Sequence, residues 1–205
     1  MATYIRLTDY KSSDEKEQEF FNPENRYESK QTDFYKVPSS PIAYWISDRT
    51  KYIFENNKKL DEIAQPRAGM QTGDNNKFLR LWSEVYFEKI GLNYSNRKNA
   101  KESKLKWFPY NKGGEFQKWY GNQDYVVNWE KDGIELYNFQ PKSVLRNSNY
   151  YFKQAITWSF IGSSTLAVRF APQGFLFDVG GSSTFPKEDQ ILYIIAFLTS
   201  KVTFS

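Results

Sequence analysis

The residues in this sequence that could do chemistry are positive charges and aromatic rings, which alternate between Arg97 and Gly133. From Arg97 to Lys118 there are seven basic side chains and two carboxylates, a local excess of +5, whereas the whole chain of 205 residues carries +4. The basic side chains are Arg97, Lys98, Lys101, Lys104, Lys106, Lys112 and Lys118, and the rings of the region are Trp107, Phe108, Tyr110, Phe116, Trp119, Tyr120, Tyr125 and Trp129. Cations neutralise phosphates, and flat rings stack on nucleobases. The region therefore predicts binding to a nucleic acid.

A second group of polar side chains lies between Gln71 and Arg80, in the run QTGDNNKFLR. Asn and Gln amides can form paired hydrogen bonds to adenine, and Arg or Lys can form them to guanine. The candidate base-reading residues of this segment are Thr72, Asp74, Asn75, Asn76, Lys77 and Arg80. The alternative is an ordinary polar turn, because Gly-Asp-Asn is common turn chemistry.

Three further segments have two interpretations each. Gly113 and Gly114 follow Lys112 and would let the backbone approach a phosphate, or they form a hairpin loop with a solvated lysine. The pair Trp119 and Tyr120 either stacks on a base or packs in the core. Gly180–Ser183 resembles a phosphate-binding loop loosely, but the Lys-Ser/Thr ending of such a loop is missing, so we expect a flexible link.

Other kinds of chemistry have few candidate residues. The sequence contains no cysteine and no histidine, which excludes disulfides, thiolate and imidazole metal sites, and nucleophile–histidine catalysis. Glu84 and Glu88 are four residues apart, as paired catalytic carboxylates can be, but with Lys89 beside them they are typical of a solvated face. We therefore predict no catalytic residue and no metal ligand in this chain.

The composition predicts a folded protein without a membrane segment. Hydrophobic residues make up 40% of the chain and charged residues 25%, and 205 residues are enough for one large domain or two small ones. The longest apolar run, Ile191–Leu198, is too short to cross a bilayer, and the N-terminus lacks the apolar core of a signal peptide. The default expectation is a cytoplasmic location.

The elements that must position these side chains follow from periodicity and turn residues. Strands are expected at Thr3–Leu7, Tyr125–Trp129 and Tyr151–Phe160, and helices at Arg49–Asn57 and Lys187–Lys201. Three segments have two possible structures: a short helix or turn at Ile134–Phe139, a strand or first helical turn at Ile42–Ile46, and a weak strand or turn at Leu60–Ala64. The segments Thr165–Phe170 and Phe175–Val179 flank the turn residues Ala171–Gly174 and predict a hairpin. The predicted fold class is α+β, with a mostly antiparallel mixed sheet and several short helices.

The chain is expected to divide near its first prolines. Residues 1–37 carry six basic and eight acidic side chains, a net charge of −2, so this segment is not the part that binds an anion. Pro38-Ser39-Ser40-Pro41 then breaks the chain. We therefore expect a lead-in segment over residues 1–37 and a binding domain over residues 38–205.

The run WFPYNKGGEFQKWYGNQDYVVNWEKDG, from Trp107 to Gly133, resembles the PglX-like adenine-specific DNA methyltransferases of BREX phage-defence systems and the related type IIG restriction–modification enzymes. Further segments that follow the order of this family are Thr3–Tyr10, Ser39–Ser47, Ala68–Trp82, Ile156–Ile161, Phe170–Phe185 and Ile194–Val202. The resemblance thus covers almost the whole chain. Ser39-Ser40 departs from it where relatives tend to have a glycine, which puts only the local turn in doubt.

The resemblance implies that this chain is a target-recognition region, with the fold of such a domain. The cofactor loop and the Asn-Pro-Pro-Tyr motif of the family lie upstream of this region, and Asn22-Pro23 is followed here by Glu24 and Asn25. Residues 1–37 would follow a missing methyltransferase domain, and residues 38–205 would be a C-terminally truncated recognition domain. S-adenosylmethionine is implied as the cofactor of that missing domain, which methylates adenine N6, and no cofactor is expected in this chain.

We therefore predict sequence-specific recognition of double-stranded DNA without catalysis by this chain alone. The predicted base-reading residues are Thr72, Asp74, Asn75, Asn76, Lys77, Arg80, Lys112, Trp119 and Tyr120, and the predicted phosphate contacts are Lys98, Lys101, Lys104, Lys106, Gly113, Gly114 and Lys118. Expected partners are double-stranded DNA, the methyltransferase domain of the parent chain and other phage-defence proteins, and no membrane. The alternatives are a carbohydrate- or protein-binding module with aromatic platforms and a nuclease that uses carboxylates and a metal.

Overall fold

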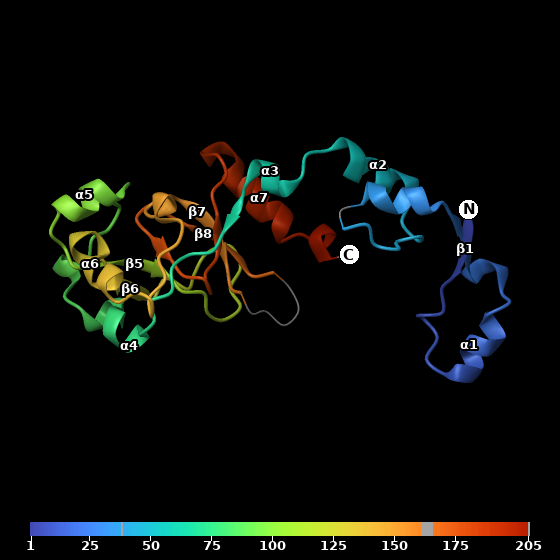
Figure 1. Ribbon diagram of the computed structural model, residues 1–205, viewed down its shortest axis with the longest axis horizontal. Coiled ribbons are helices and arrows are strands. Elements are labelled where there is room, and N and C mark those ends of the chain that lie inside the picture. Colours follow the sequence, from blue (N-terminus) through green and yellow to red (C-terminus); the bar gives the residue numbers. More distant parts are fainter. Residues whose placement is uncertain (38, 161–165, 205) are drawn as a thin grey trace. The chain divides into compact units, whose positions relative to one another are not determined.

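The structure is a computed structural model that describes residues 1–37, 39–160 and 166–204 (Figure 1). Two compact units are present, Met1–Glu62 and Ile63–Ser205. The boundary expected after residue 37 therefore falls inside the first unit. Pro38, Ile161 and Thr165, which belong to expected segments, lie outside the described residues.

The first unit is built on one antiparallel strand pair and short helices. Its elements are β1 (Ala2–Ile5), α1 (Ser13–Glu19), η1 (Pro23–Asn25), β2 (Arg26–Ser29), η2 (Gln31–Lys36) and α2 (Asp48–Asn56), and α3 (Leu60–Ile63) lies at the boundary. β1 pairs with β2 from Ala2–Ser29 to Ile5–Arg26. The expected strand at Thr3–Leu7 and the expected helix at Arg49–Asn57 are thereby confirmed.

Local signals explain where the two longer helices of the first unit begin. The Ser12 hydroxyl accepts a hydrogen bond from the backbone N–H of Glu15, and the Glu15 carboxylate accepts one from the N–H of Ser12, which is a reciprocal cap. Ser47 caps α2 by accepting from the N–H of Thr50 at 3.2 Å. The expectations at Leu60–Ala64 and Ile42–Ile46 are wrong, because the first segment is the helical turn α3 and the second forms neither strand nor helix.

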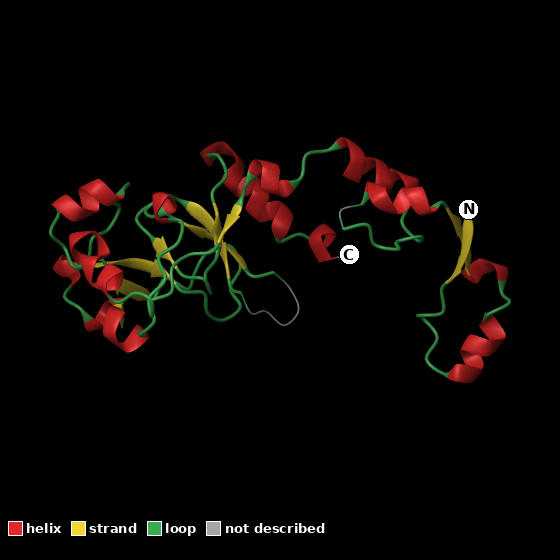
Figure 2. Cartoon of the chain, in the orientation of Figure 1, coloured by secondary structure: helices red, strands yellow, loops and turns green. Residues whose placement is uncertain are grey.

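The second unit contains two four-stranded sheets (Figure 2). The strands of the first sheet are, in spatial order, β3 (Pro66–Arg67), β10 (Ser183–Thr184), β7 (Ala155–Trp158) and β8 (Val168–Ala171), and those of the second are β4 (Leu79–Leu81), β6 (Tyr125–Asn128), β5 (Trp107–Asn111) and β9 (Leu176–Phe177). Every pair is antiparallel except β5 with β9. The predicted α+β class with mostly antiparallel sheets and short helices is confirmed.

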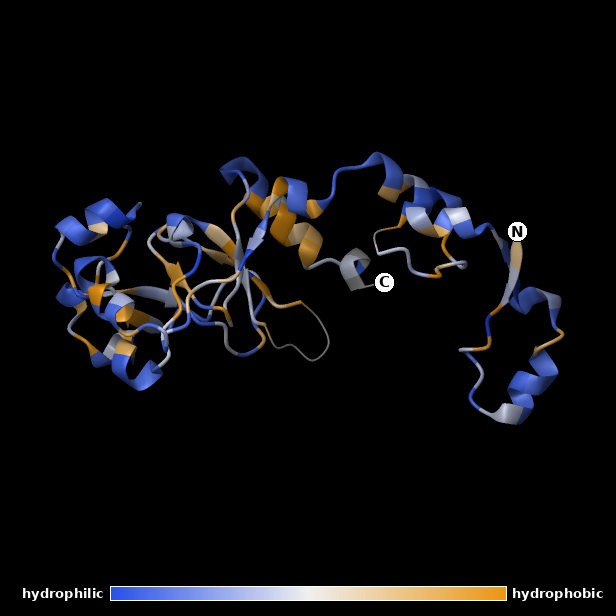
Figure 3. Cartoon of the chain, viewed as in Figure 1, coloured by the Kyte–Doolittle hydropathy of each residue, from blue (hydrophilic) through white to orange (hydrophobic). Residues whose placement is uncertain are grey.

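Helices border both sheets of this unit. They are α4 (Asn75–Phe78), α5 (Arg97–Glu102), α6 (Glu130–Asn138) and α7 (Ile191–Leu198), with the 3-10 helices η3 (Trp82–Glu84), η4 (Phe87–Lys89), η5 (Ser148–Tyr150), η6 (Glu188–Gln190) and η7 (Lys201–Phe204). α5 packs against α6, and α7 packs against β7 and β8 (Figure 1). Figure 3 shows that α5 is mainly hydrophilic whereas α7 is mainly hydrophobic. The expected helix at Lys187–Lys201 is confirmed in its central part, which is α7.

The main core lies on one face of the second sheet. In register, Leu79 and Phe108 stand opposite Val127, and all three are buried in the same cluster. Because side chains alternate along a strand, Arg80, Pro109 and Val126 occupy the other face. The sheet therefore carries the main core on one face, and on the other face Pro109 and Val126 are buried as well whereas Arg80 is half-buried.

The expected hairpin around Ala171–Gly174 is wrong. β8 pairs with β7 in the first sheet, whereas β9 pairs with β5 in the second. The turn between β8 and β9 is instead held by Phe152, whose N–H donates to the Phe175 carbonyl at 2.8 Å and whose carbonyl accepts from Gly174 at 3.0 Å. Turn residues between two apolar runs predict a reversal of the chain, but they do not specify which strands the runs will join.

The position of Phe108 in the core generates a stability test. Its ring is fully buried, with edge-to-face contacts to Tyr94 at 5.7 Å and Phe152 at 5.6 Å between centroids. We expect Phe108→Ala to lower the free energy of unfolding by about 3–5 kcal/mol, because it leaves a cavity. The exposed Phe116→Ala variant is the control and should change it by less than about 0.5 kcal/mol in urea denaturation. Equal losses in the two variants would contradict this core.

Candidate nucleic-acid interface

The two predicted base-reading segments meet at β9 and the turn that follows it. Met70 donates its N–H to the Phe177 carbonyl at 2.9 Å and accepts from the N–H of Val179 at 3.0 Å, which places the start of the Gln71–Arg80 segment beside β9. On the other side, the N–H of Asp178 donates to the Asn111 carbonyl at 2.8 Å, directly before Lys112. Segments about 40 residues apart in the sequence thus flank one turn.

The Asp178 carboxylate holds this turn. The Tyr110 hydroxyl donates to one of its oxygens at 2.6 Å, and the Gly180 N–H donates to the other at 2.7 Å. Burial, and then the neighbouring carboxylate, raises the pKa of Tyr110 well above its usual range, so the phenol stays protonated and remains a donor. Asp178 is not among the residues predicted from the sequence, where its only signal is an acidic residue two positions before a pair of glycines.

Glycines allow the backbones around this turn to come together. A Cβ on Gly181 would lie 2.3 Å from the Asn111 carbonyl oxygen, and one on Gly113, whose φ is +87°, would lie 2.5 Å from the Gly180 carbonyl oxygen. The expectation of a flexible link at Gly180–Ser183 is therefore wrong, since Gly180 and Gly181 form a packed turn and Ser183 begins β10. Gly113 is buried by this contact, whereas Gly114 is exposed.

The Gln71–Arg80 segment forms a capped turn beside Asp178. The Asp74 carboxylate accepts from the Lys77 N–H at 3.0 Å at the start of α4, and the buried Thr72 hydroxyl donates to the Asn75 side-chain oxygen at 2.6 Å. Asn75, Asn76 and Lys77 are exposed. A shallow hollow of about 370 Å³ lies here, lined by Gln71, Thr72, Gly73, Asp74, Asn75, Lys142 and Asp178. Thr72 thus positions the Asn75 side chain through its hydrogen bond, and Lys142 is a cation of this site that is not among the residues predicted from the sequence.

Arg80 is half-buried on the face of the sheet opposite the core. Its guanidinium lies 5.7 Å from the centroid of the Trp107 ring, and one of its terminal nitrogens donates to the carbonyls of Asn76 and Leu79. These contacts hold the side chain in one place.

The predicted phosphate-binding lysines form two groups. Lys98, Lys101, Lys104 and Lys106 lie on α5 or between α5 and β5, and Lys112 and Lys118 follow β5. At the rise of an extended strand, Lys106 and Lys112 are separated by about 20 Å. Over the described parts of the chain, none of the six forms an ion pair with a carboxylate. Their charge is therefore not neutralised within the protein.

Several of these cations lie over aromatic rings instead. Lys106 lies 5.6 Å from the centroid of the Trp107 ring, Lys112 lies 5.0 Å from that of Tyr125, and Lys118 lies 5.8 Å from that of Phe116. Such contacts hold a lysine stem against a ring and leave its charge uncompensated.

The rings of this region divide between the core and the surface. Phe108, Tyr110 and Trp129 are buried. Trp119 and Tyr120 are 54% and 59% exposed, so the alternative that this pair packs in the core is wrong. The backbone of Trp119 is fixed against β8, because its N–H donates to Val168 at 2.9 Å and its carbonyl accepts from Phe170 at 2.8 Å.

An ion pair holds α5, the helix that carries Lys98 and Lys101. The Arg97 guanidinium donates to both carboxylate oxygens of Asp132, at 2.8 and 2.6 Å, and to the Ser148 hydroxyl at 3.1 Å. The hydrogen bonds with Asp132 raise the pKa of Arg97. Asp132 has a φ of +64° and lies in the predicted turn Lys131–Gly133, which falls inside α6 (Glu130–Asn138). The part of α6 after this turn confirms the short helix expected at Ile134–Phe139.

The two units differ in charge. The first carries 10 basic and 12 acidic residues, a net charge of −2, and the second carries 18 basic and 12 acidic residues, a net charge of +6.

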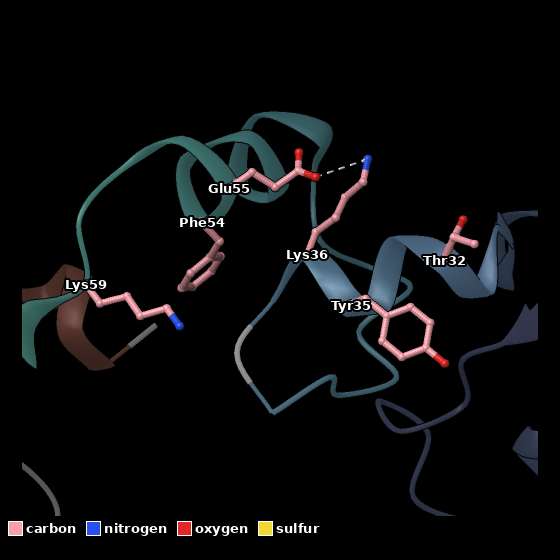
Figure 4. A pocket seen from close by; sticks show the side chains of 6 residues that line it. All are labelled: Thr32, Tyr35, Lys36, Phe54, Glu55 and Lys59. Atoms are coloured by element: carbon pink, nitrogen blue, oxygen red, sulfur yellow. Dashed lines mark ion pairs between the residues drawn. The ribbon is translucent and has the colours of Figure 1, made fainter.

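The first unit has a hollow of about 440 Å³ between η2 and α2, where Lys36 lies 3.8 Å from Glu55 (Figure 4). Among the described residues no three acidic side chains lie close enough together to hold a metal ion. None of the helices in this part of the chain has the length and the apolar sequence that a membrane span requires.

Comparison with known proteins shows which proteins contain a segment similar to this chain. No protein-family model matches the chain. It is 41% identical over 214 residues to an adenine-specific methyltransferase PglX from Lacticaseibacillus casei (strain Zhang), which covers 98% of this chain and 18% of that protein. It is 37% identical over 207 residues to an adenine-specific methyltransferase BrxX from Escherichia coli O9:H4 (strain HS), with coverages of 97% and 16%.

The chain thus spans less than a fifth of the length of these two relatives. Nearly all of it is similar to one segment of adenine-specific methyltransferases of the PglX and BrxX type, which confirms the resemblance seen in the sequence motifs.

The buried Tyr110–Asp178 contact predicts a particular loss of stability in alkali. Tyrosine ionises near pH 10 in an unfolded chain, but the raised pKa keeps Tyr110 protonated in the folded state. Above about pH 10 the unfolded state therefore binds fewer protons, and the free energy of unfolding falls as the pH rises. We expect Tyr110→Phe to be less stable than the unmodified chain at pH 7, but to lose less stability between about pH 9 and 11.

Urea denaturation of each variant at the two ends of this alkaline pH range measures the difference. The exposed Tyr86→Phe variant is the control and should follow the unmodified chain at both. If Tyr110→Phe loses as much stability in alkali as the control does, the buried phenol does not titrate as described.

Proposed function

We propose that this chain recognises double-stranded DNA as the target-recognition region of an adenine-specific DNA methyltransferase in a phage-defence system. The observation that carries the proposal is the similarity of almost the whole chain to one segment of adenine-specific methyltransferases. The chain itself transfers no methyl group. A methyltransferase domain elsewhere in the parent protein binds S-adenosylmethionine and modifies adenine N6.

Affinity in this proposal comes from the second unit, whose net charge is +6. Lysines before and after β5 contact phosphates, because their charges have no carboxylate partner among the described residues. The separation of about 20 Å between Lys106 and Lys112 is wider than the major groove of about 12 Å. The two groups can therefore contact backbones on either side of a groove.

Sequence discrimination is assigned to the side chains that flank the Asp178 turn and to Arg80. Asn75, Asn76, Lys77 and Lys112 supply amides and cations on loops whose backbones are fixed, by the α4 cap on one side and by the Gly113–Gly180 contact on the other. Arg80 is held by two carbonyls and the Trp107 ring. Each correct paired contact to a base contributes about 1–3 kcal/mol of discrimination.

A second candidate function is a carbohydrate- or protein-binding module. The exposed rings of Trp119 and Tyr120 favour it, because such platforms also stack on sugars. Binding to a neutral sugar depends weakly on salt, whereas binding to phosphates depends on it steeply.

Methylome sequencing of cells that carry the full-length parent tests the assignment of roles. We expect Asn75→Ala and Arg80→Ala to relax the preference at one base pair of the methylated motif by about 5- to 150-fold, the equivalent of one paired contact. Lys104→Ala should lower methylation of all sites alike, because a phosphate contact carries no sequence information.

Lys16→Ala, an exposed lysine on α1 in the first unit, is the matched control and should leave the methylome unchanged. The division of roles is refuted if Asn75→Ala and Arg80→Ala lower methylation uniformly, as Lys104→Ala does.

A further inference from the structure

An apolar hollow of about 320 Å³ lies on the face of the second sheet opposite the core. Pro109 of β5 and Val126 of β6 are paired in register and lie at this face. Trp82, Phe87 and Tyr125 also line the hollow. Its volume is at the lower end of the range of small-molecule sites.

Two of these rings remain exposed although they border an apolar surface. Trp82 is 52% exposed and Phe87 65%. Both belong to the short 3-10 helices that follow β4, η3 and η4, whose backbones are fixed: the Trp82 N–H donates to Asp124 at 2.9 Å, and the N–H of Ile90 donates to Phe87 at 3.0 Å. The backbones that carry these two rings are therefore fixed before any ligand binds.

One side chain with a polar amide lines the hollow and lacks a partner. The side-chain nitrogen of Gln123 is buried and has no hydrogen-bond acceptor among the residues that the structure describes. A buried amide without a partner is unfavourable and is uncommon in folded proteins. A ligand with an acceptor atom in the plane of a flat ring would satisfy it.

Positive charge borders the same hollow. Arg80 stands opposite Val126 in the sheet and therefore lies on the face that carries the hollow. Arg80 is in no ion pair within the described residues. The ligand that fits this hollow is therefore aromatic and polar at one edge, and carries negative charge outside the hollow.

We propose that this hollow binds one unpaired nucleobase of a nucleic-acid strand. The base stacks against Trp82 and Phe87, its edge accepts a hydrogen bond from Gln123, and the phosphate of its nucleotide faces Arg80. This goes beyond the recognition of paired bases in duplex DNA, because a base can enter the hollow only when it has left its stack. This site can exist even if the chain does not recognise duplex DNA, and the chain can recognise duplex DNA even if this site does not exist.

The test compares two single-stranded probes that bind to the full chain. One is an oligothymidine with a single central 2-aminopurine, and the other has an abasic site at that position. We expect the first to bind about 5- to 150-fold more tightly, the range for stacking of one base, with quenching of the 2-aminopurine fluorescence. Trp82→Ala and the nearly isosteric Gln123→Leu should each reduce this preference, whereas Arg80→Ala should weaken both probes equally.

Trp45→Ala removes an exposed tryptophan of the first unit and is the control that should keep the preference. Equal binding of the two probes by the unmodified chain, binding of neither, or a preference that survives both Trp82→Ala and Gln123→Leu would overturn the proposal. Binding to a duplex is measured in parallel, so failure of duplex recognition is seen separately. A peptide of apolar residues is tested as a competitor of both probes. If it displaces neither probe, the assignment of the hollow to a base stands. If the peptide binds while neither probe binds, the hollow is a peptide-binding site and the proposal is overturned.

Discussion

The arrangement of the second unit depends on the carboxylate of Asp178. It accepts a hydrogen bond from a buried phenol on one side and from the backbone of a glycine turn on the other, and the backbone of the same residue bonds to the end of β5. Without this residue, Tyr110 would be a buried hydroxyl without its acceptor, and the Gly180–Gly181 turn would lose the bond that shapes it. Both candidate reading loops begin at this point, so their positions relative to each other follow from it.

The surface around this turn combines fixed backbones with side chains whose charge is not compensated. Lysines lie before and after β5, and several of them lie over aromatic rings. Arg97 differs from them, because its ion pair with Asp132 holds α5 in place. A protein that only needed stability would gain from pairing such lysines with carboxylates or distributing them evenly. Within the described residues these lysines have no carboxylate partner, and this concentration of positive charge supports the proposed contact with a polyanion.

The parts of the fold that local signals determine were predictable from the sequence. Ser47 before an amphipathic run marks the start of α2, and the alternation of Tyr125–Asn128 marks β6. The supposed hairpin around Ala171–Gly174 failed because pairing is decided by distant strands. For the site, charge and residue type identified the segments, but the contact of Tyr110 with a residue 68 positions away could not be seen. Gly113 is predicted at a phosphate, and the structure gives a further reason for a glycine at this position, namely the close approach of the Gly180 carbonyl.

The most direct measurement of the central claim is the salt dependence of the binding constant of this chain for duplex DNA. If the six lysines around β5 neutralise phosphates, the logarithm of the binding constant should fall with the logarithm of the salt concentration with a slope of about −5, and each of Lys106→Ala and Lys112→Ala should reduce its magnitude by about 0.9. A slope near zero, or one that neither substitution changes, would contradict the account.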